Sequence, residues 1–169
     1  MRFYTFGNFY LSSIQQGIQG QHAFGELYNK YNDTGTPQED MYREFNARHK
    51  TSIYLNGGMQ KNLEDLYDYF KEAHKKGYNE FPFAKFYEEK DALNGSLTSV
   101  AIILPARIYN FGEILKDSQK FSDLRMEEQL NRHGFARYDF SDMNDPNTMF
   151  NNRWEYEFSK LLTTFPLAK

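Results

Sequence analysis

Apolar residues along this chain recur with a spacing of two in some stretches and of three to four in others. Residues 2–10 are rich in aromatic side chains and predict a strand. Residues 49–56 and 83–88 predict two shorter strands. Residues 97–104 end in a continuous apolar run before Pro105, as is typical of a strand covered on both faces.

Helical spacing separates these strands. A first helix is predicted from an N-cap at Ser12 or Ser13 to about residue 31, and a second over residues 38–48, after turn residues 32–37. A third helix has the most regular apolar stripe in the chain and ends near Gly77. Its stripe consists of Leu63, Leu66, Tyr67, Phe70 and Ala73, and Asn62 followed by Asp65 predicts its cap.

The first helix carries an unusual polar stripe. At about 100° per residue, Gln15, Gln19, His22 and Glu26 share one side, and Glu26 lies four residues from His22, where it can orient the imidazole ring. The predicted packing face consists of Ile14, Ile18, Gly25 and Tyr28.

Gly17, Gly20 and Gly25 also lie in this helix, and each interior glycine costs roughly 1 kcal/mol relative to alanine. We therefore expect close backbone approach to a sheet or a ligand.

The order strand, helix, strand, helix, strand, strand predicts an α/β fold: a three-layer sandwich with a mixed four-stranded sheet over residues 1–105. Residues 106–169 are expected to form a C-terminal helical extension packed on that domain. It includes a helix near residues 124–132, a polar stretch over 141–152 and an amphipathic segment over 154–162. The apolar face of the last segment is either a docking contact within the protein or a partner-binding surface.

Composition narrows the functional classes. The 169 residues contain no cysteine, which excludes disulfides, thiol nucleophiles and thiolate zinc sites. No apolar run reaches the length of a membrane span, and no leader pattern is present, so we expect a cytoplasmic protein without a membrane partner. The net charge of −3 argues against duplex DNA as a partner, because phosphate contacts need a basic excess.

No metal or cofactor is expected. His49, His74 and His133 are isolated from one another, which disfavours zinc. Residues Asp139, Asp142 and Asp145 lack the spacing and the glycine of a calcium loop.

Asn56, Gly57 and Gly58 lie between a predicted strand and a predicted helix, where open α/β sheets place ligands. Their backbone amides are candidates for holding a phosphate or carboxylate. The alternative is a turn that needs positive φ.

The first helix resembles that of the type 2 peptidyl-tRNA hydrolases, whose Gly-Lys-x-Ala-Ala-Gln-x-x-His-Ala signature follows an N-terminal strand. Laid on residues 14–23, this signature keeps Gln19, His22 and Ala23. Residues 97–105 are similar to the family's closing Thr-Val-Leu-Ala-Ile-Gly-Pro strand, and the resemblance covers residues 1–105. Segments 49–51, 55–58, 82–88 and 97–98 look like a bacteriophage-encoded branch of this fold.

The resemblance implies candidate roles for several residues. His22 would act with a carboxylate from Glu88 or Asp91, and Thr98 or Ser99 would supply a hydroxyl. Gln15 stands where the family has its lysine, a cation whose loss typically lowers a rate by roughly 10²–10³.

Two functions therefore stay open. One is an esterase that cleaves peptidyl-tRNA, with Gln15 and Gln19 positioning the ester. The other is a binding module that kept the fold without hydrolysis, in which the polar stripe and the Gly57–Gly58 turn hold a nucleotide, the 3′ end of a tRNA, or a host protein.

Overall fold

The computed structural model describes residues 1–110 and 150–168. The chain divides into two compact units. The first contains Met1–Pro105 and Phe165–Lys169, and the second contains Ala106–Thr164. The sequence also places a domain end at Pro105, but it does not anticipate the return of the C-terminal residues to the first unit.

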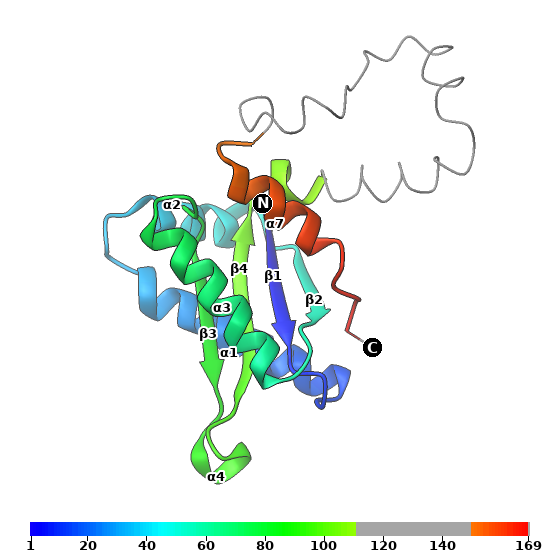
Figure 1. Cartoon of the computed structure of the whole chain (residues 1–169). Coiled ribbons are helices and arrows are strands. Elements are labelled where there is room, and N and C mark those ends of the chain that lie inside the picture. Colours follow the sequence, from blue (N-terminus) through cyan, green and yellow to red (C-terminus); the bar gives the residue numbers. More distant parts are fainter. Residues whose placement is uncertain (111–149, 169) are drawn as a thin grey trace, which may run out of the picture. The chain divides into compact units, whose positions relative to one another are not determined.

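A mixed four-stranded sheet forms the centre of the first unit, as predicted (Figure 1). The strand order is β2-β1-β4-β3, with β1 parallel to β2 and with β4 antiparallel to both β1 and β3. The strands β1, β2 and β3 therefore run in one direction, and their carboxyl ends lie at the same end of the sheet. Their bounds are β1 (Arg2–Gly7), β2 (Ser52–Asn56), β3 (Phe83–Tyr87) and β4 (Leu97–Leu104).

Helices cover both faces of this sheet, so the first unit is an α/β sandwich (Figure 1). Helices α1 (Ser13–Tyr31) and α2 (Pro37–Glu44) share one core with Phe3, Ala101 and Ile103 of the sheet. Helix α3 (Gln60–Lys75) packs on the opposite face, where the Phe70 ring lies 6.3 Å from Phe6 and 6.0 Å from Phe83. Strand β4 is buried along its whole length, as its apolar run predicts.

The packing face predicted for α1 is wrong. Ile14 and Ile18 are 76% and 50% exposed, and Tyr28 and Gly25 are also exposed. The buried face is instead Gln16, Gln19, Gly20, Ala23, Leu27 and Tyr31. Near the start of α1 the sheet presents hydroxyl groups, so polar and small residues of the helix face it.

Only one of the three glycines in α1 is needed for close packing. A Cβ at Gly20 would lie 2.6 Å from a Tyr54 ring carbon and 2.9 Å from the Thr5 methyl. The same atom would meet nothing within 4 Å at Gly17 or Gly25.

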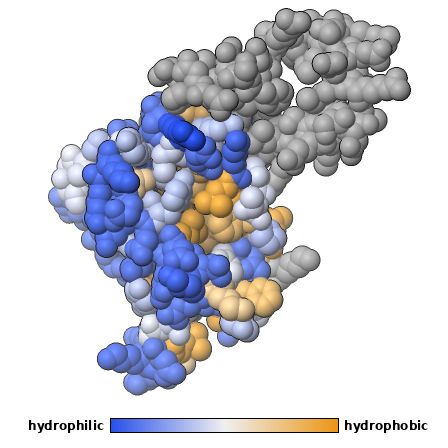
Figure 2. Space-filling view, viewed as in Figure 1, coloured by the Kyte–Doolittle hydropathy of each residue, from blue (hydrophilic) through white to orange (hydrophobic). Residues whose placement is uncertain are grey.

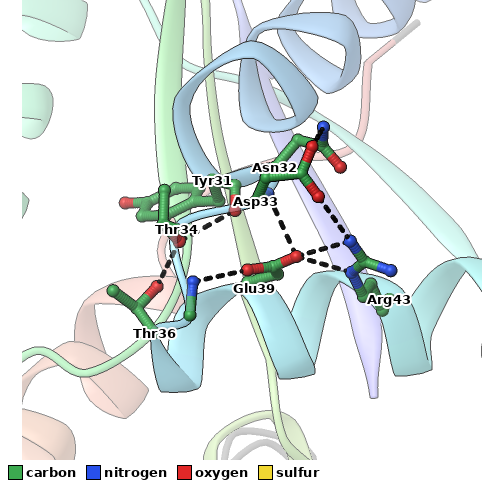
Figure 3. A network of polar contacts seen from close by, with 8 residues as sticks. Tyr31, Asn32, Asp33, Thr34, Thr36, Glu39 and Arg43 are labelled. Atoms are coloured by element: carbon green, nitrogen blue, oxygen red, sulfur yellow. Dashed lines mark hydrogen bonds and ion pairs between the residues drawn. The ribbon is translucent and has the colours of Figure 1, made fainter.

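A tight turn joins α1 to α2, and Glu39 organises it (Figure 3). Its carboxylate accepts hydrogen bonds from the backbone N–H groups of Gly35 and Asp33, at 2.8 and 3.1 Å, and from Arg43 Nε at 2.7 Å. These donors, the Gly35 amide first, lower the pKa of Glu39 below its ordinary value.

The other predicted helix bounds shift by a few residues. The second helix continues as a π-helical turn, η1 (Phe45–His49), which ends at Lys50 with a φ of 55° and delays the start of β2. Helix α3 begins at Gln60 rather than after Asn62, whose side-chain oxygen accepts a hydrogen bond from the Met59 N–H. A short helix, α4 (Lys90–Leu93), lies in the connection between β3 and β4.

The second unit is described at its two ends. Residues 106–110 are helical, and α7 (Arg153–Leu162) confirms the predicted amphipathic helix. Arg107 forms a two-pronged ion pair with the buried Glu155, at 2.7 and 3.0 Å. The helix predicted near residues 124–132 and the aspartates 139, 142 and 145 lie outside the described residues.

Candidate functional site

A buried polar layer separates α1 from the sheet near the carboxyl ends of β1, β2 and β3. At its centre, Gln19 is only 8% exposed. Its Nε2 donates to Glu88 Oε2 at 2.7 Å, and its Oε1 accepts from Thr98 Oγ1 at 2.9 Å. The structure therefore brings together three of the predicted site residues, one from α1, one after β3 and one from β4.

A β-bulge positions Thr98. The pairing of β3 with β4 jumps from Phe86–Ser99 to Tyr87–Leu97, so Thr98 is skipped. Bulges re-aim side chains in this way. Here Thr98 bonds to α1, and its neighbour Ser99 points to the same face of the sheet, where its Oγ lies 2.7 Å from Thr5 Oγ1.

The hydroxyl pair of Thr5 and Ser99 extends the polar layer beneath α1. Both residues are almost fully buried, and the contact of Gly20 with Thr5 brings the helix backbone close to them. Burying a hydroxyl costs free energy unless it is hydrogen-bonded, so removing either hydroxyl would leave the other buried without its partner.

His22 lies at the border of the layer but does not join its hydrogen bonds. Its exposed ring stacks on Phe86, with centroids 4.6 Å apart and planes 20° apart. Within residues 1–110 and 150–168, no hydrogen bond joins His22 to Glu88 or Asp91. Glu26, expected to orient the imidazole, instead accepts a 3.4 Å hydrogen bond from Asn29.

Gln15 and Asp91, two further candidates from the resemblance, lie outside the hydrogen bonds of the polar layer. The Gln15 side-chain oxygen accepts hydrogen bonds from the Ser12 N–H and hydroxyl, both at 3.0 Å, and thereby completes the N-cap of α1. Asp91 is exposed in the first turn of α4.

The Asn56–Gly58 segment is a turn whose amides are engaged. The Gly57 N–H donates to Gly7 O at 2.8 Å, and the Gly58 N–H donates to Asn56 Oδ1 at 2.9 Å. Gly58 has a φ of 87°, and a Cβ at Gly57 would lie 2.4 Å from Leu63. This geometry is that of a turn that needs glycine, and both amide N–H groups are bonded within the protein.

The surface beside this layer is apolar and partly acidic. Large hydrophobic side chains are exposed where β1, β2 and β3 end, among them Phe9 at 56% and Tyr10 at 75%. Figure 2 shows hydrophobic colour at this end, beside α4 and the start of α3, whereas the outer face of α3 is hydrophilic. We call the exposed apolar side chains at the end of β3 and in the segments that follow β1, β2 and β3 the apolar rim; they are Phe9, Tyr10, Ile14, Met59, Tyr87 and Leu93.

The charges at the apolar rim are mixed. Residues 8–18 carry no charged side chain, and the connection after β3 contains Glu88, Glu89 and Asp91 against Lys90. Lys85 Nζ donates to the Tyr87 hydroxyl at 2.9 Å, whereas the charged partner of Gln19 is the acidic Glu88.

Among the described residues, no group of three or more histidine or acidic side chains is placed to hold a metal ion. None of the helices in that part of the chain is long and apolar enough for a membrane crossing. No protein-family model matches this sequence, and comparison with curated proteins finds no match.

Sequence reasoning missed the hydroxyl pair, the stacking of Phe86 on His22, and the apolar rim. The rim has a sequence signal in the consecutive aromatics Phe9 and Tyr10, but the strand predicted over residues 2–10 includes both of them. Strand β1 ends at Gly7, so these two residues belong to the following loop.

Proposed function

We propose that this chain is a protein-binding module that presents the apolar rim, on a scaffold similar to the type 2 peptidyl-tRNA hydrolases, and that it does not hydrolyse peptidyl-tRNA. The observation that carries the proposal is the chemistry of the surface beside Gln19 and His22. Large apolar side chains are exposed there and the charged partner of Gln19 is an acid, Glu88, whereas a site for RNA needs cations beside the reacting groups.

The bonding of the candidate catalytic residues supports the absence of hydrolysis. Both polar atoms of Gln19 are bonded to Glu88 and Thr98, and the Gln15 side chain is bonded to Ser12. A general base must lie within hydrogen-bond reach of the proton it takes, and a nucleophilic water needs a place beside that base. Each oxygen of Glu88 already accepts one hydrogen bond, Oε2 from the Gln19 amide at 2.7 Å and Oε1 from the Glu89 N–H at 3.3 Å, and neither oxygen bonds to His22.

The rim suits a polypeptide partner. Aromatic and methionine side chains such as Tyr10 and Met59 are enriched at the centres of protein interfaces, and charged side chains are depleted there. We place this chain with the bacteriophage-encoded branch that it resembles, in the cytoplasm of the host cell, and the partner would then be a host protein.

The first test measures hydrolysis of a purified N-acyl-aminoacyl-tRNA by the wild type, Gln15→Lys and His22→Ala. We expect no turnover by the wild type. Turnover that His22→Ala abolishes would establish the alternative, a lysine-independent esterase, and would overturn the proposal.

The second test locates the binding surface. A photo-crosslinking amino acid is placed at Tyr10 or, as a control, at the exposed Tyr78, which lies beyond the end of α3. We expect a discrete protein adduct from position 10 and none from position 78. An RNA adduct, or no difference between the two positions, would contradict a protein-binding rim.

A further inference from the structure

The two edges of the sheet are closed by different means. At the β3 edge, side chains do it: the Phe83 carbonyl accepts from Lys30 Nζ at 2.9 Å and from the Tyr31 hydroxyl at 3.2 Å. The Phe83 N–H donates to the same hydroxyl at 3.3 Å. Because both side chains belong to α1, the backbone groups of Phe83 stay bonded as long as the helix is folded.

At the β2 edge, the backbone of a separate segment bonds to the outer backbone groups of the strand. Pro166 O accepts from the Asn56 N–H at 2.8 Å, and the Ala168 N–H donates to Tyr54 O at 3.0 Å. Leu55 and Leu167 form an antiparallel bridge between these two bonds. We call residues 165–168 the tail.

One side chain anchors the tail. The Phe165 ring lies 4.7 Å from that of Phe6, a fully buried residue of β1, in an edge-to-face contact. Leu167, in contrast, is 66% exposed and contributes mainly its backbone. Pro166 has no N–H, which shortens the ladder that the tail can form.

We propose that the outer edge of β2 is a strand-acceptor site, and that the tail of a second copy of this chain occupies it by reciprocal exchange. Once its own tail has left, the β2 edge is a template for pairing with another chain, and an extended peptide adds to such an edge through backbone bonds and one or two side-chain anchors. The occupant is argued from the chain itself, because its own Phe-Pro-Leu-Ala segment is the sequence seen to fit this edge.

The chain's organisation permits the exchange. The tail is joined to β4 through Ala106–Thr164, a compact unit of its own, so its release removes only the tail from the first unit. Exchange between two copies remakes every contact twice, and the reciprocal arrangement closes as a symmetric dimer. This inference does not depend on the apolar rim, which lies at the carboxyl ends of the strands rather than along the β2 edge.

Sedimentation velocity on the full chain tests the exchange over about 10 μM to 1 mM, the range in which a tethered segment competes with one in solution. We expect a dimer fraction that rises with concentration in the wild type and in the matched control Leu167→Ala, and that falls severalfold in Phe165→Ala. A wild type that stays monomeric throughout, or a dimer that Phe165→Ala leaves unchanged, would overturn the proposal.

A peptide probe makes the test independent of the folding of a variant. An excess of synthetic Thr-Thr-Phe-Pro-Leu-Ala-Lys, the sequence of residues 163–169, should convert the wild-type dimer into monomer. The same peptide with alanine in place of phenylalanine should not. A fluorescein-labelled copy should bind Phe165→Ala more tightly than the wild type, whose own tail competes. If the peptide leaves the dimer intact, the tail does not hold the two copies together.

Discussion

Replacing Thr98 with valine tests whether water is excluded from the polar layer beneath α1. Valine keeps the β-branched shape but removes the hydroxyl that donates to Gln19 Oε1 at 2.9 Å. Thr98 is 1% exposed, and Gln19 is also buried, so water does not readily replace the lost donor. The substitution therefore leaves a buried amide oxygen without its partner.

The expected loss in the free energy of unfolding is about 1–3 kcal/mol, the cost of leaving a buried polar atom unsatisfied. Two effects place it in the lower half of that range. Gln19 keeps its bond to Glu88, and valine has a higher preference than threonine for a buried strand position. We therefore expect about 1.5 kcal/mol, within the usual range for single hydrogen bonds.

The assay is urea unfolding followed by circular dichroism for Thr98→Val, Gln19→Leu and the double variant. Removing both partners leaves no orphaned group between them, so the double variant should lose less stability than the two single variants together, by roughly 1 kcal/mol. Thr51→Val, at an exposed threonine, is the control and should be close to neutral. A Thr98→Val variant as stable as the wild type would refute the reasoning, because it would mean that water reaches Gln19.

Three further predictions concern other parts of the molecule. Gly20→Ala should destabilise the protein because its Cβ meets the sheet, whereas Gly17→Ala, in open space, should stabilise it by up to about 1 kcal/mol; thermal unfolding measures both. Burial, with Lys71 and Lys85 nearby, lowers the pKa of Lys30 from 10.5 to about 8. The charge of Lys30 therefore disfavours folding below pH 8. The free energy of unfolding rises between pH 8 and 10.5, because the folded lysine loses its proton there while the unfolded one keeps it. Lys30→Met does not titrate but also loses the 2.9 Å bond to Phe83 O, so its stability in urea relative to the wild type should fall between about pH 8 and 10.5; a constant difference would contradict this. Arg107→Met leaves the buried Glu155 without its cation and should destabilise the second unit by about 2–3 kcal/mol, as followed by fluorescence of the single tryptophan, Trp154; an unchanged midpoint would contradict it.

Much of the fold was predictable because its strands and α3 follow simple periodicities. The apolar run of β4 predicts a strand buried on both faces, and the stripe of α3 predicts a helix packed on the sheet. Helix α1 was different: its length and its cap at Ser12 were predictable, but its buried face was not. Periodicity identifies a buried face only when that face is apolar, and this one contacts Thr5 and Ser99.

The candidate site shows the same limit. The sequence offers Gln19 and Thr98 as candidates, yet their meeting depends on the bulge at Thr98, and no local pattern marks a bulge. The tail was unpredictable for another reason. Its pairing with β2 joins residues more than a hundred positions apart, and four residues interrupted by Pro166 are too short for a strand pattern.

The geometry of the layer gives Gln19 and Thr98 a structural role. The Gln19 amide bonds at both ends, and the Thr98 hydroxyl is held between Gln19 and the Phe86 carbonyl, 3.4 Å away. These bonds tie α1 to β4 and to the connection after β3. A rigid arrangement of these elements also fixes the positions of the side chains at their ends, which include Ile14 and Tyr87 of the apolar rim.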